Sequence, residues 1–320
     1  MDKGIDRPPL PPPGSARPLD YVFLLRPMIL VPVWTFYLLG AWHGQNISGI
    51  PTDPLSLFFG MTAFTLMLGA AYIVNQITDR EADRANNKLF LLSHGIITIK
   101  GAWIEASLLA AASIAIGIFL LPGRFLIILL ISMVLGILYS VEPVRLKRRP
   151  VLDIASNAIG SGIVNTLAGW TASGASLDGY IVLLPYILAV SSVHMVTALA
   201  DIGGDRDSGL MTSGVALGRR KGMILATVLM AGASIACMRV GNRPALYATL
   251  LSLPLMAIMI RAGKRKPDQT RILLPAIVST VVFSLTAVFF FPFYLPFLVT
   301  IVLLTRLYYS RRFGIKYPSL

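Results

Sequence analysis

The chain has 320 residues, of which 55% are hydrophobic and only 13% charged, and its formal net charge is +13. Soluble domains carry about 25% charged residues, so a chain this apolar is not an ordinary soluble protein. The composition indicates a multi-pass α-helical membrane protein with a single domain. The Lys and Arg residues lie in short loops between apolar segments, which is typical of membrane topology and argues against nucleic-acid binding.

The two ends of the chain are polar. Residues 1–20 are rich in Pro and are expected to form a disordered or extended cytoplasmic tail, without a cleavable signal peptide. One transmembrane domain is expected over residues 21–310, and residues 311–320 form a basic cytoplasmic tail. The single Cys237 lies in an apolar segment and excludes both an intrachain disulfide and a metal site built from cysteines.

Ten apolar segments are long enough to be considered as membrane spans. We predict an all-α fold, a transmembrane bundle of nine or ten helices around a central cavity open to the cytoplasmic side. The last segment is the least regular, because Pro292 and Pro296 interrupt its start. The segments are 22–43, 55–77, 103–121, 124–141, 152–173, 180–200, 222–240, 244–260, 271–291 and 293–310.

The loops alternate in charge along the chain. Basic residues gather before the first segment and after the second, fourth, sixth and eighth, whereas the other loops are short and nearly uncharged apart from the loop with Arg239 and Arg243. The positive-inside rule therefore places the N-terminus in the cytoplasm, and ten spans would return the C-terminus there. The polar stretches NQITDREADRANNK, YSVEPVRLKRRP and DIGGDRDSG then share the cytoplasmic face. We expect an integral protein of the cell (inner) membrane.

Two clusters of carboxylates end apolar segments. Asn75, Asp79 and Asp83 are four residues apart and would lie on one helical stripe. Asp201 and Asp205 repeat the spacing after the sixth segment, where Gly203 and Gly204 are expected to break or loosen the helix. Like charges four apart repel, and acids at a helix C-terminus meet the negative end of its dipole. A sequence that retains these carboxylates despite both unfavourable interactions indicates a bound cation.

Oxygen-only ligands favour Mg²⁺, which takes one or two protein carboxylates together with phosphate oxygens. Two acidic helix ends on one face therefore predict a diphosphate site bridged by Mg²⁺, with the basic YSVEPVRLKRRP loop available to bind the diphosphate. Solvated loops with internal ion pairs are the alternative for each cluster alone. Topology-setting charge is the alternative for Arg148 and Arg149.

These residues resemble the UbiA superfamily of intramembrane prenyltransferases. Asn75, Asp79 and Asp83 match its N-D-x-x-D-x-x-x-D motif, with Gln76 where the family usually has Asp. Asp201 and Asp205 match D-x-x-x-D, YSVEPVRLKRRP is similar to Y-S-x-P-P-x-R-L-K, and Arg26-Pro27 matches an Arg-Pro of the first span. Three features depart from the pattern: NNKLFLLSHG replaces R-P-L-x-S-G, Glu142 replaces a Pro, and segment 293–310 is added.

The resemblance implies an enzyme that binds an isoprenyl diphosphate through Mg²⁺, generates an allylic carbocation and transfers the prenyl group to an acceptor. It assigns the metal to Asn75, Asp79, Asp83, Asp201 and Asp205. Side chains expected at the diphosphate are Lys88, Arg145, Lys147 and Arg206. Side chains expected at the acceptor or cavity are Arg26, Tyr139, Asn157, Asn165 and His194.

Each expected cavity residue has a structural alternative. Polar residues inside spans often connect helices by hydrogen bonds, as Asn157, Asn165 and His194 could do. Tyr139 could equally be an interfacial anchor. A dry apolar cavity among the spans would protect a carbocation from water and hold a prenyl tail supplied from the lipid.

Three functions remain open. The leading one is a Mg²⁺-dependent prenyltransferase, and the nearest alternative is a terpene cyclase or carotenoid elongase with the same diphosphate site. A transporter would place ionisable residues near the bilayer midplane, whereas here the acids lie at span ends. The sequence identifies neither the acceptor, the prenyl length nor the oligomeric state.

Overall fold

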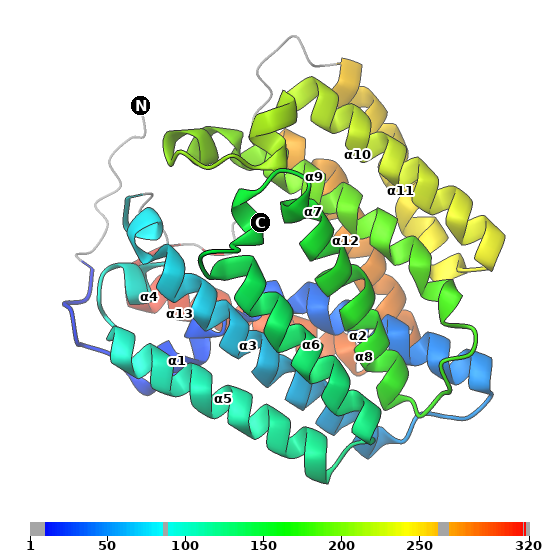
Figure 1. The fold of residues 1–320 in the computed structure, drawn as a ribbon, viewed down its shortest axis with the longest axis horizontal. Helices are drawn as coiled ribbons and strands as arrows, with labels where there is room; N and C mark the ends of the chain where they lie inside the picture. Colours follow the sequence, from blue (N-terminus) through cyan, green and yellow to red (C-terminus); the bar gives the residue numbers. More distant parts are fainter. Residues whose placement is uncertain (1–9, 86–88, 262–268, 316, 318–320) are drawn as a thin grey trace.

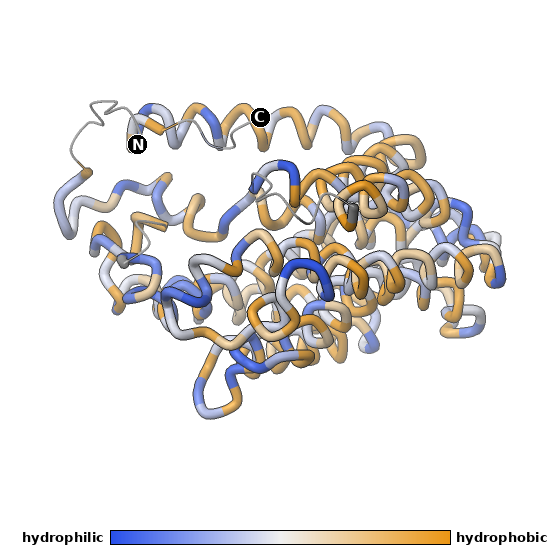
Figure 2. The backbone as a smooth tube through the Cα atoms, turned by 90° about the horizontal axis from the view of Figure 1, so that it is seen from above, coloured by the Kyte–Doolittle hydropathy of each residue, from blue (hydrophilic) through white to orange (hydrophobic). Residues whose placement is uncertain are grey.

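The structure is a computed structural model that describes residues 10–85, 89–261, 269–315 and 317. The described part is helical without strands, which confirms the predicted all-α class. Figure 2 shows hydrophobic residues along the lengths of the helices and hydrophilic ones mainly at turns and helix ends. The long helices of the described chain are α2 (Pro27–Ser48), α3 (Pro54–Ala85), α5 (Ile99–Phe119), α6 (Gly123–Ser140), α9 (Leu184–Asp207), α10 (Ser213–Val240), α11 (Arg243–Arg261), α12 (Gln269–Phe290) and α13 (Tyr294–Phe313).

Short elements join the long helices. The segment expected at 152–173 is helical throughout but divided into α7 (Leu152–Asn157), a π-helix η2 (Ala158–Val164) and α8 (Asn165–Ala172). The remaining short elements are α1 (Pro18–Leu24), α4 (Phe90–Ser93), η1 (Leu146–Arg148) and η3 (Tyr180–Leu183).

The described residues contain seven helices long and apolar enough to cross a membrane, or eight if α1 and α2 form one bent span. Two of the expected segments are not in this set. Segment 152–173 is interrupted by its π-helix, and α13 contains the basic residues Arg306, Arg311 and Arg312 toward its end. The total of nine or ten spans stays a prediction, as does the side on which the termini lie.

The helices form two groups that meet around a central space. In one group α3 packs against α5 and α6, and in the other α9, α10, α11 and α12 pack in sequence, with α12 returning to α9. Helix α2 connects the groups by packing against both α8 and α12 (Figure 1). The carboxylate clusters lie at the C-terminal ends of helices α3 and α9.

The two acidic helix ends differ in how well they were predicted. Helix α3 extends beyond the apolar segment 55–77 to Ala85, so the first acidic motif is helical, as its spacing predicted. Helix α9 continues through Gly203 and Gly204 to Asp207, so the predicted break there is wrong. Glycine costs only about 1 kcal/mol in a helix interior, and the neighbouring turns of α9 supply enough backbone hydrogen bonding to carry the helix through.

Helix α2 approaches α8 closely because glycine occupies the contact on both sides. A Cβ at Gly169 would lie 1.7 Å from the Tyr37 carbonyl oxygen, and one at Gly40 would lie 1.9 Å from the Thr166 carbonyl oxygen. Small residues that allow backbones to approach are a common device for helix packing in membranes. This contact fixes α8, and with it the π-helix, against α2.

The added helix α13 is tied to the N-terminal part of the chain. Arg312 bonds both carboxylate oxygens of the fully buried Asp20, at 2.8 and 3.1 Å, and Tyr308 donates to the same carboxylate at 2.6 Å. The Tyr308 ring stacks on Phe23 of α1 at a centroid distance of 3.8 Å. Near its start, the Tyr294 hydroxyl donates to the Val31 carbonyl of α2. Helix α13 therefore packs against both α1 and α2 and stabilises their positions.

The α2–α8 contact predicts a sharp difference between two Gly→Ala variants. Gly169→Ala should lower the thermal unfolding midpoint of the detergent-purified protein strongly, because the new methyl group collides with a backbone oxygen that cannot move away. Gly203→Ala adds a methyl group to open space, with no heavy atom within 4 Å, and should leave the midpoint unchanged or raised. Equal midpoints for the two variants would contradict the packing.

The buried ion pair between Arg312 and Asp20 predicts that two neighbouring Arg→Met variants differ in amide hydrogen exchange. Arg312→Met leaves the Asp20 carboxylate buried without its cation, which typically costs about 3–5 kcal/mol. Amide hydrogen exchange should accelerate in α13 and in residues 15–24. The neighbouring Arg311 is exposed and makes no ion pair within the described chain, so Arg311→Met serves as the control and should exchange like the unmodified protein.

Candidate active site

The polar stripe of α3 runs from the interior of the bundle to its end. Asn75 lies deepest, and its amide donates to the Ser140 hydroxyl of α6 at 3.0 Å. Asp79 and Asp83 follow at one-turn intervals. Gln76 points elsewhere: it is 2% exposed and donates to the Leu24 carbonyl at 2.8 Å, so it holds α1 against α3.

The second acidic end belongs to α9. Asp201 and Asp205 are one helical turn apart, and Asp205 accepts a hydrogen bond from the Thr212 hydroxyl at 2.8 Å. The same Thr212 begins α10 by accepting from the Val215 backbone amide. The turn between α9 and α10 is thereby folded back toward the acidic end.

The ends of α3 and α9 line one cavity of about 300 Å³, which we call the acidic cavity. Two carboxylates of each end, together with Lys147 and Arg148, contribute to its wall. Helices that are more than a hundred residues apart in the chain therefore bring their acids to the same space. The acids lining this cavity are Asp79, Asp83, Asp153, Asp201 and Asp205.

The loop after α6 places two cations on Asp79. The Arg145 guanidinium donates to one oxygen of Asp79 at 2.9 Å and to Glu142 at 2.9 Å, while the Lys147 ammonium bonds the other oxygen of Asp79. Arg145 has a left-handed backbone conformation (φ 39°) that turns the loop back onto α3. These contacts neutralise the charge that Asp79 would otherwise place at the negative end of the α3 dipole.

The same contacts set the ionisation of the loop. Burial lowers the pKa of Lys147, and the Asp79 carboxylate opposes that shift. The hydrogen bond from Arg145 lowers the pKa of the exposed Glu142. The loop therefore presents a partly desolvated ammonium to the acidic cavity, where it would meet an incoming anion.

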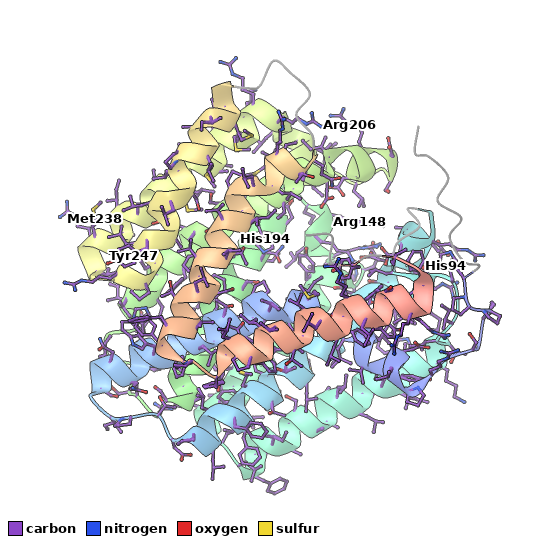
Figure 3. The ribbon with its side chains drawn as sticks, turned by 180° about the vertical axis from the view of Figure 1, so that it is seen from behind. His94, Arg148, His194, Arg206, Met238 and Tyr247 are labelled. Carbon is purple, nitrogen blue, oxygen red and sulfur yellow. The ribbon has the colours of Figure 1, made fainter. Side chains whose placement is uncertain are left out.

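The expected diphosphate residues fall in different places. Lys147 lines the acidic cavity, and so does Arg148, which the sequence left open. Arg145 is 9% exposed and contacts Asp79 from outside the lining, and Arg206 is exposed at the outer end of α9 (Figure 3). Lys88 lies outside the described residues.

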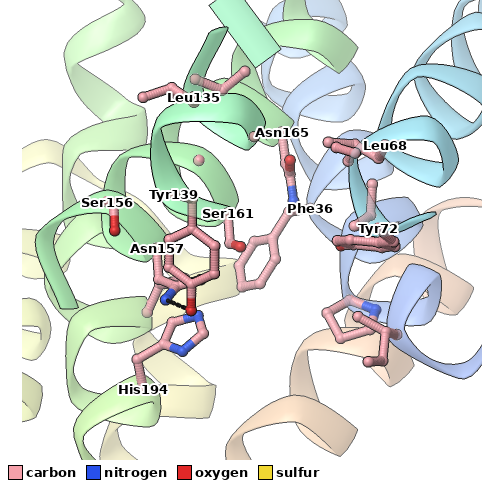
Figure 4. Close-up of a pocket in the computed structure, with 18 of the residues that line it drawn as sticks. Phe36, Leu68, Tyr72, Leu135, Tyr139, Ser156, Asn157, Ser161, Asn165 and His194 are labelled. Atoms are coloured by element: carbon pink, nitrogen blue, oxygen red, sulfur yellow. Dashed lines mark hydrogen bonds between the residues drawn. The ribbon is translucent and has the colours of Figure 1, made fainter. Parts of the chain in front are cut away.

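A second, larger cavity of about 450 Å³ lies deeper in the bundle, and we call it the central cavity. It shares Tyr139, Asn157, His194 and Thr197 with the acidic cavity, so the two cavities adjoin at these residues, which we call the neck. At this neck the Asn157 amide donates to the Tyr139 hydroxyl at 3.2 Å (Figure 4). Arg26 lines the central cavity from the break between α1 and α2, and Asn75 and Asn165 line it as well.

Asp153 was not among the residues expected from the sequence. It is 7% exposed and accepts from the Ser213 backbone amide at 2.7 Å, from the Ser213 hydroxyl and from its own helix at Ile154. It therefore joins the start of α7 to the start of α10 beside the acidic cavity. The available signal was an acid in the first turn after Pro150, a position that favours carboxylates.

The donor set suits a hard divalent cation that also binds phosphate. Within the described ranges no three His, Cys, Asp or Glu side chains lie close enough to hold a metal by themselves. Mg²⁺ binds through one or two carboxylates and completes its shell with water and substrate phosphate oxygens. Pairs of carboxylates from two helices that line one cavity fit that requirement.

The Asp153 contacts predict a local loss of order. Asp153→Asn cannot accept from Ser213 with the same strength and should cost about 1–3 kcal/mol of stability. Hydrogen exchange should accelerate at the start of α10 and in the turn that leads into it. Asp178→Asn, which alters an exposed carboxylate bonded only to Ser176 in the described chain, is the control and should exchange normally. Unchanged exchange in Asp153→Asn would contradict the assigned role.

Comparison with known proteins agrees with this architecture. A homogentisate phytyltransferase of Synechocystis sp. is 31% identical over 218 residues, covering 64% of this chain and 68% of that protein. A lycopene elongase/hydratase of Haloferax volcanii is 25% identical over 269 residues, covering 83% and 84%. A probable homogentisate phytyltransferase 2 of Oryza sativa is 27% identical over 198 residues, which is 57% of this chain and only half of that protein.

A solved structure has the same fold. The structure of a UbiA homolog from Archaeoglobus fulgidus bound to GPP and Mg²⁺ matches with a TM-score of 0.67 and 21% identity, covering 83% of this chain and 98% of that one. The family model described as "UbiA prenyltransferase family" matches residues 29–274. The expected membrane-enzyme class is therefore confirmed, and the chain belongs to the UbiA prenyltransferase family.

Proposed function

We propose that the protein transfers a prenyl group from an isoprenyl diphosphate to a lipophilic or aromatic acceptor within the membrane, with Mg²⁺ and with release of diphosphate. The observation that carries the proposal is the pair of acidic helix ends around one cavity, which shares lining residues with the apolar central cavity. The Archaeoglobus fulgidus homolog, solved with GPP and Mg²⁺, supports the same donor and cation here.

We assign the cation to Asp79 and Asp83 on one wall and Asp201 and Asp205 on the other, with Asn75 beneath them. Bound Mg²⁺ would stabilise the negative charge that develops on the departing diphosphate. Lys147 and Arg148 face the same space and add charge-assisted hydrogen bonds to the phosphate oxygens. Arg145 lies outside the cavity lining and orients Asp79 through their ion pair.

The chemistry follows from the order of the two cavities. The bond between C1 of the prenyl group and the diphosphate oxygen breaks, and its electron pair leaves with the diphosphate. The acceptor then donates an electron pair to C1 and loses a proton. His194 lies at the neck and makes no side-chain hydrogen bond within the described chain, so we assign it to receive that proton. The apolar walls of the central cavity keep water away from C1.

Elongation of a carotenoid or cyclisation of the donor is the second candidate. The specific support is the similarity to a lycopene elongase/hydratase over 84% of that protein. In both reactions an alkene supplies the electron pair, and the acidic cavity performs the same task. We also propose that the site opens to the cytoplasmic side of the cell membrane, as the basic loops indicate.

The assigned carboxylates predict a selective loss of activity. In purified protein reconstituted in lipid nanodiscs, Asp79→Asn and Asp201→Asn should each reduce transfer from labelled geranyl, farnesyl or geranylgeranyl diphosphate by roughly 100-fold or more. Homogentisate, lycopene and a membrane lipid extract serve as acceptors, and mass spectrometry identifies the labelled product.

Glu81→Gln is the matched control, because Glu81 lies on the same turn of α3 but is exposed and absent from the cavity lining. It should keep full activity. Chelation with EDTA should abolish transfer, and added Mg²⁺ should restore it. Full activity of Asp79→Asn, or activity that persists in EDTA, would overturn the proposal.

A further inference from the structure

One wall of the central cavity carries a row of polar side chains. Asn157, Ser161 and Asn165 are spaced four residues apart along α7, η2 and α8, and all three line the cavity. In an α-helix a four-residue step overshoots a full turn by roughly 40°, so the side chains of such a row are progressively offset. The π-helix between residues 158 and 164 has a wider turn than an α-helix, and all three side chains line the cavity across it.

The deepest member of the row is Asn165. Asn165 is 3% exposed as a residue and lines the cavity, and no hydrogen bond joins its side-chain amide to another described residue, so the amide is accessible to whatever occupies the cavity. The polar side chains beside it are satisfied within their own helix: Thr166 donates to the Gly162 and Ile163 carbonyls. A ligand that covers this amide without forming a hydrogen bond to it loses about 1–3 kcal/mol. An apolar prenyl tail would leave the amide unpaired in this way, whereas a ligand oxygen would pair with it.

The surroundings of Asn165 suit a flat molecule. Figure 4 shows Asn157, Ser161 and Asn165 on one side of the cavity, the Phe36 ring beside Ser161, and Leu68 and Tyr72 on the opposite side. Asn157 belongs to the neck shared with the acidic cavity, and Asn165 is eight residues further along, roughly 10 Å deeper. A ligand of one or two rings could span that depth.

We propose that Asn165, assisted by the Ser161 hydroxyl, recognises an oxygen on the acceptor. The acceptor is then a hydroxylated or carbonyl-bearing ring, with the reacting carbon at the neck and an oxygen on the opposite edge at Asn165. This inference rests on the proposed function and narrows it, because a hydrocarbon polyene has no group for Asn165. Asn165 is a specificity-determining residue and takes no part in holding the diphosphate.

A binding measurement without any diphosphate tests this assignment separately from prenyl transfer. The probes are 2-methyl-1,4-naphthoquinone and 2-methylnaphthalene, which share a ring system and differ in the two oxygens. Unmodified protein in nanodiscs should bind the oxygenated probe roughly tenfold more tightly than the hydrocarbon, as expected for one buried hydrogen bond. Asn165→Leu, which has a similar volume, should remove that preference while keeping the affinity for the hydrocarbon.

Thr286→Val is the control, because Thr286 lies on α12 outside the cavity lining and its hydroxyl already bonds the Val282 carbonyl. It should keep the tenfold preference. Mg²⁺-dependent binding of geranyl diphosphate should be the same in Asn165→Leu and in the unmodified protein, which shows that the variant is folded. The proposal is overturned if the unmodified protein fails to prefer the oxygenated probe, or if Asn165→Leu keeps the preference.

Discussion

The structure depends on how the negative charge at the ends of α3 and α9 is balanced. Carboxylates four residues apart at a helix C-terminus repel one another and oppose the helix dipole. At the end of α3, Arg145 and Lys147 compensate Asp79, and the loop that carries them is folded back by the left-handed conformation at Arg145. These contacts join the loop after α6 to the end of α3 beside the acidic cavity.

The rest of the fold holds this arrangement at the mouth of an apolar space. Helix α2 fixes α8 through the glycine contact, α8 positions the π-helix, and Asp153 connects α7 to the start of α10. The added helix α13 is not part of either cavity lining, but its buried Arg312–Asp20 pair secures α1 and with it the break at which Arg26 enters the central cavity. Charged side chains therefore gather at one end of the bundle and apolar surface lies behind them, with the shared neck residues between the two cavities.

Much of this could be predicted from residue types and spacing. The i, i+4, i+8 pattern of Asn75, Asp79 and Asp83 predicted a shared helical stripe, and the apolar segments predicted most of the long helices. The extension of α9 through Gly203 and Gly204 could not be predicted, because local propensity favoured a break and neighbouring turns overrode it. The roles of Arg145 and Asp153 depend on contacts between distant segments, which spacing does not reveal. The π-helix between Asn157 and Asn165 leaves no periodic signal in the sequence.

The central claim is that two separate helix ends act as one site for Mg²⁺ and diphosphate. Calorimetric titration of Mg²⁺ into the nanodisc-embedded protein, with and without the non-reactive analogue geranyl S-thiolodiphosphate, tests it most directly. We expect the analogue and Mg²⁺ to strengthen each other's binding reciprocally, and this coupling to disappear when either Asp79 or Asp201 is changed to Asn. Tight Mg²⁺ binding that is independent of the analogue, or coupling that survives the loss of one helix end, would contradict the account.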